Sequence, residues 1–172
     1  VSFGVLYGIS AKGLQAQLKS KCHTDWTEEQ CQEMIDLWLE TAYPQVKWYM
    51  ERQKHFCRQN GYVESLFGRR RYLPGVHSTI PRIREEAYRA AINHPIQSTA
   101  AEILKIAERN IYSNVLPLFH ELGFYLEPIL AIHDEICLEA EISIAKEVEA
   151  AVIWEMENTI QLCVPVVSKG KI

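Results

Sequence analysis

The sequence lacks any long hydrophobic run. No apolar stretch approaches the ~18 residues that a helix needs to cross a bilayer, and the opening VSFGVLYGIS has neither the basic start nor the length of a signal peptide. Paired cysteine motifs are also absent, since the five cysteines are widely spaced, form no CxxC pair and leave one over. We therefore expect free thiols, a cytoplasmic location and no membrane partner, rather than a disulfide framework or a zinc site.

Charge of each sign is concentrated in a different part of the chain. The 172 residues are 48% hydrophobic, enough for one or two compact units, and carry a net charge of −4. Residues 45–89 hold ten Lys and Arg against four Glu, a local charge of +6, which leaves −10 on the rest. This separation fits a metal-dependent enzyme that acts on phosphates. A set of solvated helix faces would have the same distribution, so both interpretations stay open at this point.

Hydrophobic periodicity and capping signals predict a mainly helical chain with a small sheet. Helices are expected over 10–20, 27–41, 44–59, 81–93, 97–122 and 144–160. We expect a break at Pro95 and a cap at Ser143 for the last helix. Short strands are predicted around Gly68, and a tight antiparallel hairpin over 125–132 and 136–140, followed by a final strand over 164–172. The expected fold class is α+β.

The stretch LAIHDEICLE places His133, Asp134 and Glu135 at the junction of the predicted hairpin. An ionised carboxylate buried without a partner costs several kcal/mol, so we expect these side chains at an exposed turn. A carboxylate there can reach a divalent cation. An ordinary acidic turn is the alternative, because Asp is common in turns.

Four segments occur in order along almost the whole chain: SFGVLYG, LFGRRRYLP, RAAINHPIQSTAAEI and IHDE. In these motifs the sequence closely resembles the A-family DNA polymerases of the bacterial polymerase I type. The resemblance implies fingers helices over 1–60 and a partial palm with the hairpin over 61–172. It implies a template-directed enzyme of DNA replication and repair that transfers nucleotides from dNTPs to a primer 3′-hydroxyl. The implied setting is a bacterial or phage-infected cell, with an organelle left open.

The resemblance also assigns roles to individual residues. Phe3 and Tyr7, four apart on one helical face, match the aromatic pair that flanks the nucleotide sugar and the templating base. Core packing is their alternative role. Arg71 and Arg89 match positions that face the duplex and the active site. For Arg71, a solvated hairpin tip is the alternative.

Further along the chain, Asn93 and Gln97 match the polar pair that contacts primer and template near the nascent base pair, with a capping role around Pro95 as the alternative. In the hairpin, His133 would contact the primer end. Asp134 would be the catalytic metal ligand, and Glu135 a secondary catalytic carboxylate.

The resemblance implies two Mg²⁺ ions, shared with an Asp outside this chain. The family's upstream Lys and Arg, which grip the triphosphate, also have no counterpart here. We therefore expect a fingers and palm fragment whose partners are primer-template DNA, dNTPs and an upstream polymerase segment in the same or a separate chain. The fragment by itself is expected to be inactive. A noncatalytic nucleic-acid-binding remnant and a related single-subunit RNA polymerase are the alternatives.

Overall fold

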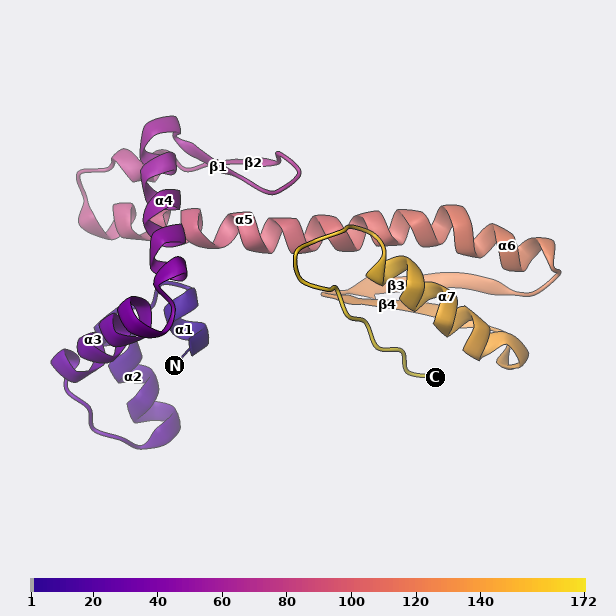
Figure 1. Ribbon diagram of the computed structural model, residues 1–172, viewed down its shortest axis with the longest axis horizontal. Coiled ribbons are helices and arrows are strands. Elements are labelled where there is room, and N and C mark those ends of the chain that lie inside the picture. The colour runs from indigo at the N-terminus through magenta and orange to yellow at the C-terminus, as the bar shows by residue number, and fades with distance from the viewer. Residues whose placement is uncertain (1) are drawn as a thin grey trace. The chain divides into compact units, whose positions relative to one another are not determined.

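The structure is a computed structural model that describes the backbone of residues 2–172 and the side chains of residues 4–172. Helices dominate, and the strands form two separate two-stranded antiparallel sheets (Figure 1). The predicted α+β class is therefore confirmed. The chain divides into two compact units, Val1–Ser98 and Thr99–Ile172, with the boundary inside helix α5. The assignment of 1–60 to fingers and 61–172 to palm stays a prediction.

The first unit opens with three helices, α1 (Ser2–Leu6), α2 (Ala11–Cys22) and α3 (Glu28–Leu37). Their starts follow local chemistry, because the Ser10 hydroxyl accepts from Gly13 N at 3.2 Å and Thr27 forms the predicted capping box with Gln30. A π-helical turn, Trp38–Ala42, extends α3 close to the expected end. Buried side chains of these helices form one hydrophobic core: Val5, Ala11, Leu14, Cys31 and Ile35.

Helix α4 and the first sheet complete this unit together with the start of α5. α4 (Pro44–Asn60) begins with proline at its first position and ends at Gly61, whose φ of 75° suits glycine. β1 (Tyr62–Glu64) pairs with β2 (Arg70–Tyr72) around Gly68, which we call the β1–β2 ribbon. A second core lies under it: Cys57, Val63, Leu73, Val76, Ala87 and Ala91.

Helix α5 (Pro81–Asn110) runs without interruption through Pro95, so the predicted helix break is wrong. An interior proline has no N–H for the helix ladder and costs about 3 kcal/mol. The carbonyl that loses its helical donor to Pro95 is that of Ala91. The neighbouring Ile92 carbonyl is held from another helix, because the Tyr49 hydroxyl donates to it at 2.9 Å. The buried Ala91 and Ile92 also anchor this part of α5 in the first unit. Tertiary contacts thus hold a helix that the local sequence disfavours.

In the second unit, a π-helical turn (Ile111–Val115) and α6 (Leu116–Glu121) extend the course of α5. The irregular turn ends two residues before Pro117, which has no N–H to offer to the helix ladder. Gly123, with a φ of 84°, follows α6 as predicted. β3 (Leu126–Ile132) and β4 (Glu135–Ala140) then form the expected antiparallel hairpin (Figure 1). A bulge at Ile129 interrupts their register.

The last helix, α7 (Ala145–Glu157), follows a 3₁₀ turn at Ile142–Ile144. Ser143 lies inside that turn and does not cap the helix, so its predicted role is wrong. The final strand is also wrong, because the described residues 158–172 form no strand. There Ser168 N donates to Glu157 Oε1 at 2.8 Å, so the segment bonds to α7 instead of a sheet. α7 packs in a third core: Ile111, Val115, Leu116, Phe119, Leu126, Ile144, Val148 and Val152.

Candidate active site

The β3–β4 hairpin ends in a two-residue turn made by His133 and Asp134, with Ile132 paired to Glu135. All three polar side chains at this tip are exposed, as the cost of burying charge predicts. His133 has a φ of 55°, a left-handed conformation that non-glycine residues adopt at some cost. Strained backbone of this kind concentrates at functional sites. The tip therefore presents two adjacent, exposed carboxylates, Asp134 and Glu135, at a two-residue turn.

A groove of about 1100 Å³ in the second unit includes the carboxylates of this tip in its lining. Its walls come from α5, β4, α7 and the C-terminal segment. Asp134, Glu135 and Glu149 contribute acidic groups, while Lys169 and Lys171 contribute cations from the C-terminal segment. The remaining lining is largely apolar. Sequence reasoning did not find these lysines, because no motif connects them with the hairpin.

The donor set at the tip suits a hard cation. Mg²⁺ is usually bound through one or two carboxylates, with water and substrate phosphates completing its shell. Asp134 and Glu135 supply that kind of donor. No group of three or more His, Cys, Asp or Glu side chains in the described residues could hold a metal ion on its own. The chemistry fits Mg²⁺, but this part of the chain provides only a share of the ligands.

A second set of predicted residues lies together in the first unit. Arg89, Asn93 and Gln97 follow at four-residue spacing, and because α5 is continuous they share one helix face. Asn93 Nδ2 donates to the Tyr7 carbonyl at 3.4 Å, and a Cβ placed on Gly8 would lie 3.4 Å from Arg89 Cγ. The turn after α1 thus packs against the Arg89–Asn93 part of α5.

Tyr7 lies just beyond the end of α1 rather than within it, so its predicted helical position is wrong. The helix closes at Gly8, whose φ is 73°, with bonds from Gly8 N to Val5 O and from Ile9 N to Gly4 O, each at 2.9 Å. This pattern is a glycine-terminated helix end. Tyr7 remains 48% exposed, so core packing does not account for it. The side chain of Phe3 lies outside the described residues.

Tyr49 is a supporting residue that sequence reasoning missed. Its hydroxyl holds the Ile92 carbonyl, directly before Asn93, and so connects α4 with the polar face of α5. Burial raises the pKa of Tyr49 to about 12, which keeps the hydroxyl a donor across the physiological range. The two residues are 43 positions apart in the sequence, so no local pattern could have indicated the contact.

The three arginines of the β1–β2 ribbon differ in their surroundings. Arg70 Nε donates to Glu64 Oε1 at 2.6 Å, and its guanidinium lies 4.6 Å from the centre of the Tyr62 ring. The bond to Glu64, with the nearby Tyr62, raises the pKa of Arg70. Arg69 and Arg71 are exposed and form no ion pair within the described residues. Within the described residues, the Arg71 side chain forms no hydrogen bond or ion pair with α5.

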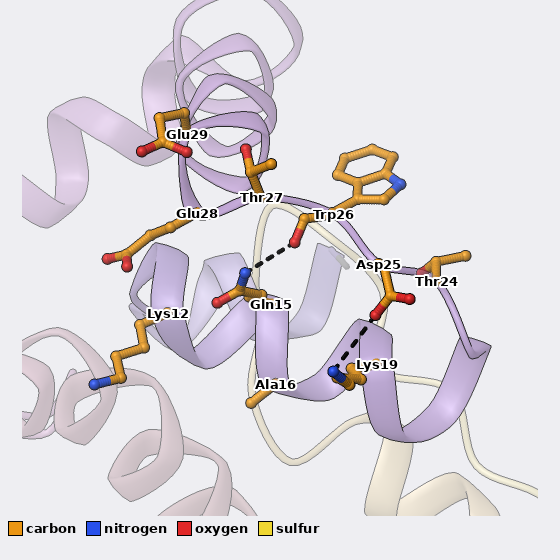
Figure 2. A pocket seen from close by; sticks show the side chains of 10 residues that line it. All are labelled: Lys12, Gln15, Ala16, Lys19, Thr24, Asp25, Trp26, Thr27, Glu28 and Glu29. Carbon is orange, nitrogen blue, oxygen red and sulfur yellow. Dashed lines mark hydrogen bonds and ion pairs between the residues drawn. The ribbon is translucent and has the colours of Figure 1, made fainter.

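A smaller pocket, of about 600 Å³, lies between α2 and the start of α3 (Figure 2). Figure 2 shows the Gln15 amide donating to the Trp26 carbonyl at 2.9 Å and Lys19 paired with Asp25 at 3.5 Å. The charged residues that line this pocket are of both signs, and none of the predicted site residues lines it. We therefore do not assign it to the candidate site.

The family model described as DNA polymerase family A matches residues 1–172. The chain belongs to this family. Curated relatives include a thermostable DNA polymerase I from Thermus filiformis, 40% identical over 96% of this chain and 18% of its own length. A DNA polymerase I from Caldicellulosiruptor bescii is 37% identical over 99% of this chain and 19% of its own length. The chain thus spans about a fifth of the length of these relatives.

A solved structure supports the same assignment. The polymerase domain of Pol1 from M. smegmatis, in complex with DNA primer-template and dNTP, matches with a TM-score of 0.82 and 34% identity. The match covers 95% of this chain and 27% of that one. The resemblance seen in the sequence motifs is therefore confirmed at the level of the family and of the fold.

Proposed function

We propose that this chain is the fingers and palm portion of a template-directed DNA polymerase that transfers nucleotides from dNTPs to a primer 3′-hydroxyl. The family match over 1–172 supports a DNA polymerase rather than a single-subunit RNA polymerase. The observation that carries the proposal is the exposed Asp134 on the two-residue turn of an antiparallel hairpin, in a chain of this family. The solved relative was captured with DNA primer-template and dNTP.

The proposed metal ligand is Asp134, with Glu135 as a supporting carboxylate and an Asp outside these residues completing the site. When bound, the two Mg²⁺ ions would activate the 3′-hydroxyl and neutralise the triphosphate charge. In this proposal His133 positions the primer end beside the carboxylates. Most of the catalytic effect would then come from alignment and charge stabilisation.

The first unit would hold the nucleotide and the nascent base pair. Arg89 offers a forked donor for phosphate oxygens, and the amides of Asn93 and Gln97 suit acceptors that every base pair presents in the minor groove. Contacts of this type test the shape of a pair without fixing its sequence. Phe3 and Tyr7 would flank the sugar and the templating base. Arg71 would contact the DNA backbone.

The proposed setting is the cytoplasm. All five cysteines are free thiols, which supports a reducing compartment. Among the described residues, no helix has the length and apolar character needed to span a membrane.

A noncatalytic DNA-binding remnant is the second candidate, because the described residues hold no complete metal cluster. Primer extension separates the two functions. In an enzyme assembled with an upstream polymerase segment, Asp134→Ala should nearly abolish nucleotide addition and leave primer-template binding within about twofold. Glu135→Ala should be milder.

The matched control is Glu139→Ala, an exposed carboxylate on the same hairpin away from the turn. That variant should extend primers at a near-normal rate. Turnover of Asp134→Ala comparable to that of the control would overturn the catalytic assignment and favour the remnant.

A further inference from the structure

The outward side of α4 carries aromatic and polar side chains in one row, at helical spacing. The row lies opposite the buried Cys57, and its members are exposed. We call this row the α4 stripe: Trp48, Arg52, His55 and Gln59. None of these residues belongs to the predicted site, and none matches a motif of the chain.

Trp48 is 63% exposed, which is unusual for the largest apolar side chain. The Arg52 guanidinium lies 5.2 Å from the centre of its ring, so the indole already has a cationic neighbour. Arg52 has no ion pair in the described part of the chain, whereas Lys47 and Lys54 are paired with carboxylates at 2.7 and 2.8 Å. The stripe therefore combines an accessible aromatic surface with an uncompensated positive charge.

Proteins that bind single-stranded nucleic acids use aromatic rings together with cationic side chains such as arginine. Bases stack on the ring irrespective of sequence, and the cation attracts the backbone phosphates. The charge of α4 is complementary to this partner, since the helix has four Lys and Arg residues and one Glu. Tyr49, next to Trp48, bonds to the Ile92 carbonyl, so α4 is fixed to the turn of α5 that carries Asn93.

We propose that the α4 stripe is a binding site for single-stranded DNA, used for the unpaired part of the template strand. A base stacks on the Trp48 indole while Arg52 contacts a neighbouring phosphate. This inference rests on the proposed function, because it assumes that the chain handles primer-template DNA. A protein partner would instead use the exposed Trp and Arg as anchors, and the test below separates that outcome.

The test is the affinity of residues 1–172 for fluorescein-labelled oligo(dT) of 16 nucleotides, measured by fluorescence anisotropy. Trp48→Ala should weaken binding by at least about fivefold, the lower end expected for loss of one stacked base. Trp48→Phe should retain most of the affinity. The matched control is Trp154→Ala on α7, where the indole is 61% exposed, and it should bind like the parent chain. Circular dichroism confirms that each variant keeps its helices.

Salt dependence tests the cation separately. Arg52→Ala should reduce the slope of log affinity against log salt by about 0.7, the value for one phosphate contact on a single strand. Equal affinities of Trp48→Ala and Trp154→Ala, or no binding of oligo(dT) by the parent chain, would overturn the inference. Either result would leave the Asp134 assignment intact, because that assignment is judged by primer extension in the assembled enzyme.

Discussion

Arg70 and Glu64 stand directly opposite each other in the β1–β2 ribbon, and the guanidinium Nε donates to the carboxylate at 2.6 Å. The Tyr62 ring lies on the same guanidinium. Arg70 is therefore engaged within the ribbon, whereas its neighbours Arg69 and Arg71 are exposed and unpaired within the described residues. Arg70 thus holds the ribbon together, and under the proposed function Arg69 and Arg71 are left to contact a polyanion.

This division predicts different salt dependences for primer-template binding. Arg69→Ala and Arg71→Ala should each flatten the slope of log affinity against log salt by roughly 0.9, the value for one phosphate contact on duplex DNA. Arg70→Ala should leave the slope nearly unchanged and instead increase amide exchange in the ribbon. Equal slopes for all three variants would contradict the division.

The double substitution Glu64→Arg with Arg70→Glu provides the control for this prediction. It reverses the pair and keeps opposite charges facing each other across the strands. Amide exchange in the ribbon of the double variant should be close to that of the parent chain. Glu64→Arg alone should show faster exchange, because it places two arginines opposite each other.

The Tyr49 hydroxyl predicts a pH-dependent contribution to stability. Its pKa is raised from 10 to about 12 by burial, so the contribution is fully present below pH 10 and is lost as pH rises toward 12. The unfolded chain releases the phenol proton first, which favours unfolding in that interval. Urea unfolding at pH 9 and pH 11.5 should show a smaller pH-dependent loss in Tyr49→Phe than in the parent chain.

At pH 8, Tyr49→Phe should also be less stable by about 1 kcal/mol, because the Ile92 carbonyl loses a donor. Tyr112→Phe, which changes an exposed tyrosine, is the control and should change neither quantity. Identical pH profiles for the parent chain and Tyr49→Phe would mean that the phenol titrates normally.

The left-handed turn residue His133 predicts a distinctive ranking of substitutions. His133→Val should destabilise the second unit relative to His133→Gly by more than about 1 kcal/mol, because a β-branched residue tolerates positive φ poorly. Thermal unfolding of the two variants measures the difference. A valine variant as stable as the glycine variant would mean that the turn adopts another conformation.

Residues 1–172 by themselves are predicted to show no measurable primer extension. Asp134 and Glu135 supply carboxylates from one side only, and the described residues contain no three-ligand group. Mg²⁺ tolerates incomplete or distorted coordination badly. Extension assays with and without an upstream segment carrying the family's Asp and Lys decide this point. Efficient extension without that segment would show that the ligand set is complete here.

Much of the fold was predictable from the sequence because it depends on neighbours in the chain. The caps Ser10 and Thr27 bond to backbone groups only three residues away. The glycines that follow helix ends, Gly61 and Gly123, are also next to or near the last residue of the helix. The β3–β4 hairpin follows from two β-compatible runs with a tight turn between them. The candidate site residues came from ordered motifs, whose agreement with a family does not require knowledge of the packing.

Only the tertiary structure decided the features that depend on distant partners. Pro95 predicts a break, but α5 continues because Tyr49 and the buried core hold that turn. The predicted last strand is replaced by an irregular segment bonded to Glu157. The α4 stripe also required the structure, because the sequence does not show which side of a helix the core will cover. In each case the observed structure is stabilised by burial or by hydrogen bonds between segments that are separated in the sequence.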